Sequence, residues 1–341
     1  MLLTALLLTL GAVDCPPRGG LQFLCGLGAT EELAPIPGTR WMLASNLNVG
    51  APAPLLVVDR DSRRVRPVYP ANALPPKRDV SLPADCQAPP DPTRMSTDGL
   101  ALRAGRGGIH RLHVANHGDR QAVELFDVDV RGARPRLRWV GCVPMPAGTL
   151  PNAVAVLPGE GFLVISFHDP ADPQAWDRMA RGEDTGRVFA WQPQTGLREM
   201  ADSRMSGGNG LALSRDGREV YASAWSGSRL VVLQRDGGPR REIILPFLPD
   251  NLHRLDDGSL LVGGQRTTAR AVGACQGPHC PQPWVIARVD PRTGTVETLI
   301  EGPGSEVVDY ACGAVLVGDR LYITVRGDRR LVVAPFKNRG R

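Results

Sequence analysis

The chain has 341 residues, a formal net charge of +5, 22% charged residues and 42% hydrophobic residues, proportions that exclude extensive disorder. The length is large for one ordinary domain but normal for a closed all-β architecture. The basic excess is mostly Arg dispersed among acidic residues, without the concentrated basic stripe of a nucleic-acid surface, so we expect no nucleic-acid partner.

The N-terminus reads MLLTALLLTLGAVDC. Its apolar run from Leu2 to Val13 is much shorter than the ~20 residues that a membrane span requires. It resembles the core of a signal peptide, with small residues at Thr9 and Gly11 before a cleavage point, although no Lys or Arg precedes it. We assign residues 1–20 to a signal peptide and leader, with an N-terminal strand as the alternative. We expect a secreted or periplasmic protein with no stable transmembrane span.

Short β-strands recur along the rest of the chain. The clearest unit reads GNGLALSRDG, EVYASAWSG, RLVVLQRD and REIILP, and each piece ends near Gly, Asp or Pro. Six such units of about 40 to 65 residues follow one another. The first unit begins at Glu31 and contains WMLAS and PLLVVDRD. The next four run from Asp98 to Val143, Asn152 to Met200, Gly208 to Pro246 and Asp250 to Gly302. The last begins at Val308 and ends with LVVAPF. We predict an all-β fold over residues 21–341, a six-bladed β-propeller with four antiparallel strands per blade. The repeats of the alternative, a parallel β-helix, are far shorter.

Seven cysteines suit an exported chain better than a cytosolic one. Cys275 and Cys280 flank a short loop and are predicted to form a disulfide, with a metal knuckle that includes His279 as the weaker alternative. The odd count leaves at least one thiol over. The cysteines that cannot be paired from the sequence are Cys15, Cys25, Cys86, Cys142 and Cys312.

Polar residues stand at the starts of the predicted inner strands, which line the axis of a propeller. They are Glu31, Glu32, Asp98, Asn152, Asn209, Asp250 and Asn251. Several carboxylates buried together in a tunnel require a cation, and carboxylate and amide oxygens are the ligands that Ca²⁺ prefers. Asn and Asp before a strand are also turn formers, but their recurrence at one blade position favours a metal site. The predicted Ca²⁺ ligands are Glu31, Asn152, Asn209, Asp250 and Asn251.

The sequence resembles the superfamily of paraoxonases, the gluconolactonase known as senescence marker protein, and strictosidine synthase. The matching stretches are TEELAPIPGTRWMLAS, HVANHGDRQAVELF, LPNAVAVLPGEGFLVISFHDP, GNGLALSRDGREVYAS and LPDNLHRLDDGSLLVGG, in the family's order. The paraoxonase pattern implies the same five ligands for a catalytic calcium. The gluconolactonase pattern implies Glu31, Asn209 and Asp250 as ligands, with Asn152 near the substrate.

The sequence departs from the paraoxonase pattern at two site positions. Asp98 stands where paraoxonases have the His proposed as general base. Ala153 stands where they have an Asp that helps to bind a second, structural calcium, which leaves Glu32 and the carbonyl of Leu100 as possible ligands for a second metal. In addition, no cysteine follows Cys312, so the family's disulfide between the chain ends cannot form.

Two histidines match the paraoxonase pattern. His117 in ANHG matches the second His of a proposed dyad, and His168 in SFHDP matches a His at the rim of the active site. Either could instead be structural. We expect His168 and Asn152 to contact the substrate.

These observations predict a calcium-dependent hydrolase of small-molecule lactones or esters. The carboxylate of Asp98 or Asp250 would activate water with the help of His117, and a free Asp98 is the better base because calcium lowers the pKa of a bound Asp. The alternatives are a non-enzymatic, ligand- or protein-binding propeller with a structural calcium, and a condensation of the strictosidine synthase type, which lacks the calcium cluster. The segments 168–183 and 266–283 are expected to shape specificity.

Overall fold

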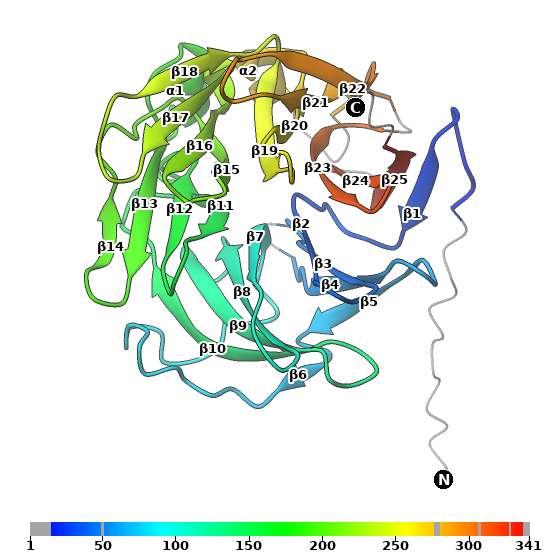
Figure 1. The fold of residues 1–341 in the computed structure, drawn as a ribbon, viewed down its shortest axis with the longest axis vertical. Coiled ribbons are helices and arrows are strands. Elements are labelled where there is room, and N and C mark those ends of the chain that lie inside the picture. The colour runs from blue at the N-terminus through cyan, green and yellow to red at the C-terminus, as the bar shows by residue number, and fades with distance from the viewer. Residues whose placement is uncertain (1–14, 49–50, 276–279, 306–307, 327–328, 337–341) are drawn as a thin grey trace.

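A computed structural model of the chain describes residues 15–48, 51–275, 280–305, 308–326 and 329–336. The predicted signal-peptide core lies outside these residues. In the described part of the chain, the strands form six sheets arranged as a ring around a central axis (Figure 1). This confirms the predicted six-bladed β-propeller with four antiparallel strands per blade.

Each sheet runs from an inner strand at the axis to an outer strand at the rim. The inner strands are β2 (Leu33–Pro35), β7 (Thr97–Arg103), β11 (Pro151–Val156), β15 (Gly208–Leu213), β19 (Leu248–Arg254) and β23 (Ala311–Val317). The second strands are β3 (Trp41–Ala44), β8 (Ile109–Asn116), β12 (Phe162–Ser166), β16 (Glu219–Ala224), β20 (Leu260–Gln265) and β24 (Arg320–Val325).

The outer half of each sheet is also regular. The third strands are β4 (Leu55–Asp59), β9 (Ala122–Asp129), β13 (Arg187–Gln192), β17 (Arg229–Gln234), β21 (Trp284–Val289) and β25 (Arg330–Pro335). The outermost strands are β5 (Arg64–Tyr69), β10 (Arg136–Pro144), β14 (Gly196–Glu199), β18 (Arg241–Ile244), β22 (Val296–Gly302) and β1 (Gln22–Cys25). The second sheet gains a short parallel fifth strand, β6 (Ala73–Leu74), beside β10.

The ring is closed by the N-terminal strand. β1 pairs antiparallel with β25, from Gln22 opposite Val333 to Cys25 opposite Arg330 (Figure 1). The sixth blade was predicted to lie entirely after Val308, but its outermost strand is β1, near the start of the chain. Backbone pairing therefore joins the two ends of the chain, where paraoxonases use a disulfide.

The core lies between neighbouring sheets. Between the first and second blades, buried Leu43 and Leu55 belong to one cluster with Leu112, Val114 and Phe126. Alternation along each strand places these side chains against the next sheet. Burying a side chain such as Phe126 stabilises the fold by about 1.5–3 kcal/mol.

All seven cysteines fall within the described residues. The predicted Cys275–Cys280 disulfide is confirmed, Cys15 pairs with Cys25, Cys86 pairs with Cys142, and Cys312 is free and buried. Three disulfides indicate an oxidising compartment.

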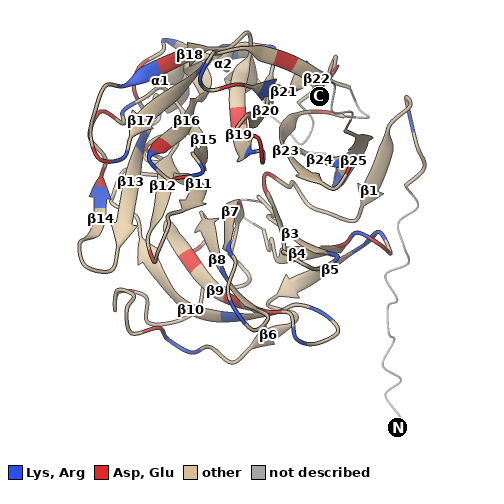
Figure 2. Cartoon of the chain, viewed as in Figure 1, with Lys and Arg blue, Asp and Glu red and all other residues tan. Residues whose placement is uncertain are grey.

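The described helices are short. α1 (Ala175–Ala180) and α2 (Ala269–Ala274) lie within the two segments expected to shape specificity, and a 3₁₀ turn spans Trp225–Gly227. None of the helices in the described part of the chain is long and apolar enough to cross a membrane. Acidic and basic residues are interspersed around the ring (Figure 2).

Candidate functional site

An irregularity recurs at the same place on the inner strands. In five blades, the pairing of the inner strand with the second strand shifts at Thr97/Leu100, Pro151/Val154, Gly208/Leu211, Pro249/Leu252 and Ala311/Gly313. The residues within these shifts are Asp98, Asn152, Asn209, Asp250 with Asn251, and Cys312. An extra residue in a strand leaves the ladder and re-aims its side chain. In the first blade, Glu31 and Glu32 directly precede β2, and Ser45 Oγ accepts hydrogen bonds from both of their backbone N–H groups.

Glycines after two of these residues allow neighbouring inner strands to approach closely. A Cβ atom on Gly99 would lie 2.3 Å from the carbonyl oxygen of Asn152, and one on Gly210 would lie 2.3 Å from that of Asp250. Only glycine fits at such distances. The Asp-Gly and Asn-Gly pairs therefore bring the polar residues of adjacent blades together.

Two carboxylates and a thiol form the centre of the cluster. Ligand atoms of Glu31, Asp250 and Cys312 all lie within 4.8 Å of one another, and all three residues are buried. Asn251 Nδ2 donates a hydrogen bond to the backbone oxygen of Glu31 at 2.8 Å, which links the fifth blade to the first. Residues from the first, fifth and sixth inner strands thus meet at one point.

Three amide oxygens near this centre lack partners. Oδ1 of Asn152, Asn209 and Asn251 is buried without a hydrogen bond, in residues that are only 9%, 7% and 1% exposed. A buried polar atom without a partner costs about 1–3 kcal/mol. Ca²⁺ binds about six to eight oxygens, including amide and carboxylate oxygens. These buried donors, three amide oxygens without partners and two carboxylates, are of the type that the predicted calcium binds.

The carboxyl groups resist ionisation when no cation is present. Burial, followed by the charge of Asp98, raises the pKa of Glu31 to about 7, although Arg326 acts in the opposite direction. Burial and the charge of Glu31 raise the pKa of Asp250 well above its usual range. Arg326 Nε lies 3.7 Å from Glu31 Oε1, but its side chain is 51% exposed and only partly offsets the negative charge.

Asp98 and His117 form a buried pair beside this centre. His117 Nε2 and Asn152 Nδ2 each lie 3.1 Å from Asp98 Oδ2, and His117 Nδ1 lies 3.2 Å from Gln121 Oε1. Oxygen atoms of Asp98 and Gln121 therefore face the two ring nitrogens of His117. Both contacts to Asp98 use Oδ2, and no described residue donates a hydrogen bond to Asp98 Oδ1.

A second tier of residues comes from the ends of the second strands. These strands run antiparallel to the inner strands and finish at the site, as the pairs Thr97–Asn116 and Leu248–Gln265 show. The tier comprises His117, Phe167, His168, Trp225, Gln265 and Arg326. Sequence reasoning found only the two histidines. The shared blade position could have identified the others.

Gln265 connects this tier to the cluster. Its Nε2 donates to Asp250 Oδ2 and to the carbonyl oxygen of Ala311, both at 2.9 Å. Its Oε1 accepts a hydrogen bond from Trp225 Nε1 at 2.9 Å. Gln265 therefore fixes the Asp250 carboxylate with one amide and leaves the other oxygen of Asp250 for a ligand.

Aromatic side chains pack above the site. Phe167 contacts His168, Trp176 of α1 and Trp225, with ring centroids 5.2–5.9 Å apart. Residues of α1 and α2 share a buried cluster with Phe167, Trp225 and Cys312. Burial is the first cause of a lowered pKa of His168, whose Nδ1 lies 2.8 Å from the carbonyl oxygen of Asp169. α1 and α2, which belong to the segments expected to shape specificity, therefore contribute to an apolar cover at the site end of the tunnel.

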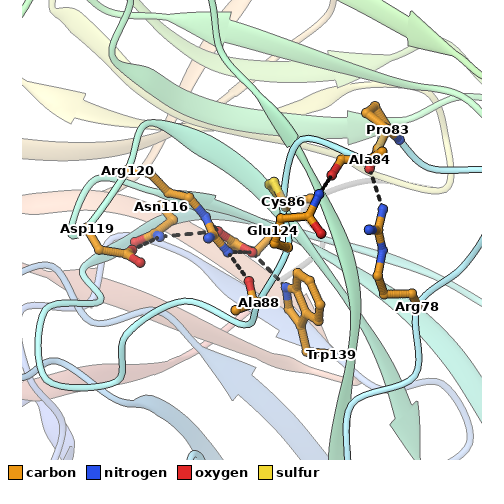
Figure 3. Close-up of a disulfide and its surroundings, with 12 residues drawn as sticks. Arg78, Pro83, Ala84, Cys86, Ala88, Asn116, Asp119, Arg120, Glu124 and Trp139 are labelled. Carbon is orange, nitrogen blue, oxygen red and sulfur yellow. Dashed lines mark hydrogen bonds and ion pairs between the residues drawn. A yellow bond between two sulfur atoms is a disulfide. The ribbon is translucent and has the colours of Figure 1, made fainter.

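A buried ion pair anchors the loop that carries His117 (Figure 3). Glu124 is fully buried and accepts hydrogen bonds from Arg120 Nε at 2.6 Å, Arg120 Nη2 at 2.9 Å and Trp139 Nε1 at 2.8 Å. Figure 3 shows this network beside the disulfide of Cys86. Asn116 Nδ2 also lies 3.4 Å from Glu124 Oε1, so the network links both ends of the segment 116–124, which carries His117.

The residues expected to bind a second metal lie elsewhere in the tunnel. Glu32 and Leu100 line a cavity of about 490 Å³. Glu32 Oε1 lies 2.8 Å from His253 Nε2 and accepts a hydrogen bond from the Leu33 backbone at 2.8 Å. Burial alone would lower the pKa of His253, but the charge of Glu32 and its hydrogen bond raise it by more, so the pKa lies above its usual value. The contact with His253 thus occupies Glu32 Oε1, and the second metal stays a prediction.

Comparison with known proteins identifies the architecture. No protein-family profile matches the sequence, and no curated protein matches it. Among solved structures, a luciferin-regenerating enzyme matches with a TM-score of 0.60 and 14% identity over 94% of this chain and 96% of its own. A gluconolactonase from Xanthomonas campestris matches with a TM-score of 0.58 and 22% identity over 94% and 91%. The calcium-binding protein regucalcin from Agrobacterium tumefaciens matches with a TM-score of 0.53 and 12% identity over 87% and 82%. The chain has the gluconolactonase and regucalcin fold. This agrees with the resemblance seen in the sequence, and at such identities it extends to the fold alone.

Proposed function

We propose that this chain is an exported, calcium-dependent hydrolase of small lactones or esters, including aryl esters. The three orphaned amide oxygens beside two buried carboxylates carry this proposal, because a hard cation would satisfy all of them. Two of the structurally similar proteins are a gluconolactonase and a calcium-binding regucalcin, which supports the same function. The three disulfides support a secreted or periplasmic location.

The ligands proposed for Ca²⁺ are Glu31, Asn152, Asn209, Asp250 and Asn251. Bound there, Ca²⁺ would supply a Lewis acid for the carbonyl oxygen of the substrate and for the oxyanion that develops on it. Gln265 donates a hydrogen bond to one carboxylate oxygen of Asp250, so Asp250 has its other oxygen left to offer a cation. Asp250 is therefore better suited to be a ligand than a base.

Asp98 is the proposed general base. His117 and Asn152 hold Oδ2, so Oδ1 is the atom that can take a proton from an attacking water. Asn152 donates to Asp98 through Nδ2 while its own Oδ1 has no partner, so one amide can connect the base to the metal. His117 would stabilise the protonation change on Asp98. A base of this kind contributes about 10²–10⁴-fold to the rate.

The covering loops would position the substrate. His168 lies between Phe167 and Trp176, with ring centroids 5.2 and 6.3 Å away, and is the proposed contact for the substrate at the rim, together with Asn152. The aromatic side chains beside it suit the apolar part of a lactone or an aryl ester.

The test is hydrolysis by metal-stripped protein with and without added Ca²⁺, on a panel of lactones and aryl esters. We expect turnover that depends on Ca²⁺ and falls by about 10²-fold or more in Asp98→Asn. Asp236→Asn, on an exposed loop, is the matched control and should keep full activity. Tight Ca²⁺ binding with no hydrolysis on any substrate would favour the non-enzymatic propeller with a structural calcium.

A further inference from the structure

The sixth blade contributes a thiol to the tunnel. Cys312 occupies the position on β23 that Asp98 and Asn209 occupy on their own inner strands, and a glycine follows each of the three. It is fully buried and is the one cysteine outside a disulfide, with all seven cysteines described. Its Sγ lies within 4.8 Å of carboxylate oxygens of Glu31 and Asp250.

The partnerless amides provide independent evidence that a ligand binds beside this thiol. Asn251 packs against Gly313, the residue after Cys312, because a Cβ atom on Gly313 would be 2.8 Å from the Cβ of Asn251, and its Nδ2 donates to the backbone oxygen of Glu31. Asn251 is 1% exposed and its Oδ1 has no hydrogen-bond partner. The thiol is therefore one member of a buried set of donor atoms, most of which are oxygens.

Metal ions discriminate between these donors. Ca²⁺ binds oxygen and has little affinity for sulfur, whereas Zn²⁺ binds thiolate, carboxylate and imidazole with about four ligands. Cys312, Glu31 and Asp250 would fill three such positions and leave one for an amide oxygen or water.

We propose that Cys312 is a thiolate ligand to a borderline divalent ion of the Zn²⁺ class, in a mixed sulfur–oxygen site with Glu31 and Asp250. On coordination the thiol proton passes to solvent, because a metal-bound thiol is deprotonated. The tunnel then binds two classes of ion through overlapping ligand sets, oxygen alone for Ca²⁺ and oxygen with sulfur for Zn²⁺. This inference rests on the proposed metal centre but is independent of whether the protein hydrolyses lactones.

The competing explanation is that Cys312 is a small apolar residue of the core. It packs in one cluster with Tyr310 and Val272, and buried cysteines often do no more than fill space. The two explanations differ in the effect of Cys312→Ser, which removes sulfur and keeps the size and a hydroxyl.

The experiment titrates metal-stripped protein separately with Zn²⁺, Co²⁺ and Ca²⁺, in buffer that contains no thiols. In wild type, Co²⁺ should produce the strong near-ultraviolet absorption of a thiolate–cobalt bond, and disulfide cysteines cannot produce it. In Cys312→Ser we expect this band to vanish and the Zn²⁺ affinity to fall about 100-fold or more, while the Ca²⁺ affinity changes by no more than about 3-fold. Asn209→Ala is the matched variant, which removes a proposed oxygen ligand and keeps the sulfur. It should weaken Ca²⁺ binding without removing the cobalt–sulfur band.

A wild-type protein that binds Co²⁺ or Zn²⁺ without the sulfur band overturns the proposal, and this measurement needs no variant to fold. Equal Zn²⁺ affinity in wild type, Cys312→Ser and Cys312→Ala also overturns it. Thermal unfolding and Ca²⁺ titration of each variant show that the tunnel is intact. Lactone hydrolysis in Ca²⁺ is assayed separately, so a failure of the proposed function is distinguishable from a failure of the thiolate ligand.

Discussion

Removing the metal should make the stability of this protein depend on pH through Glu31. Its carboxyl is buried near Asp98 and Asp250, and its pKa rises from 4.5 to about 7 in the folded protein. A group whose pKa is raised on folding contributes its full stabilisation below the unfolded value and loses it as the pH rises through the folded value. Metal-free protein should therefore lose this contribution between about pH 4.5 and about pH 7.

The pKa sets the size of the effect. The interval from 4.5 to about 7, at about 1.4 kcal/mol for each pH unit, corresponds to about 3 kcal/mol of unfolding free energy. Glu31→Gln keeps the shape and removes the ionisation, so it should lack this loss. Ca²⁺ reverses the sign, because it binds the ionised carboxyl. The stabilisation by Ca²⁺ should therefore grow as the pH rises over the same range. Below pH 7, the Ca²⁺ affinity should increase about tenfold per pH unit for each proton that binding displaces.

The measurement is urea unfolding of wild type and Glu31→Gln across this pH range, with and without Ca²⁺. Glu160→Gln, at an exposed turn, is the matched control and should follow wild type. Metal-free wild type and Glu31→Gln should diverge as the pH rises. Parallel stability curves for these two proteins would refute the reasoning, because the carboxyl would then carry no burial penalty.

Four further changes probe the site and its supports. Asp98→Asn should lower turnover by about 10²-fold or more with Ca²⁺ affinity nearly unchanged, and weaker Ca²⁺ binding in calorimetry would make Asp98 a ligand instead. Asn209→Ala should reduce Ca²⁺ affinity about tenfold or more and remove part of the stabilisation by Ca²⁺, and equal melting temperatures in saturating Ca²⁺ with full activity would refute its assignment. Trp176→Ala should raise KM for aryl esters more than it lowers kcat, because this side chain lies in the apolar cover and not among the polar groups. Glu124→Ala should destabilise the protein by about 3–5 kcal/mol in urea unfolding, because it leaves Arg120 and Trp139 Nε1 without their buried partner, whereas Glu124→Gln should cost less.

The sequence predicted the ring and most of the inner strands because both signals are local. In five of the six predicted units, a polar residue at the start of the inner strand is followed by an apolar run, as in Asn152 and Asn209. One blade repeated around an axis places equivalent residues together, so the order of the blades is enough to predict which residues converge.

Other features depend on contacts distant in sequence. β1 is four residues long, and nothing in QFLC specifies β25, more than 300 residues later, as its partner. Gln265 and Arg326 reach the site through the ends of second strands, where the sequence has no repeated motif and only the shared blade position could have identified them. Cys312 lies at the same blade position as Asn209, but an odd cysteine count directed attention to disulfides instead of to its place on β23.

The metal centre and the closure of the ring are physically linked. Glu31 belongs to the first blade, Asp250 to the fifth and Cys312 to the sixth, so their ligand atoms meet only when the last blade has docked against the first. That docking is completed by β1, which belongs to the sixth sheet and leads directly into the segment that carries Glu31. Cys15–Cys25 fastens the chain that precedes this strand. A cation bound at the axis stabilises the closed ring by mass action, because an open ring has no complete site. The carboxylates of Glu31 and Asp250, which would repel one another in the closed, metal-free tunnel, would thus join the first and fifth blades once a cation is bound.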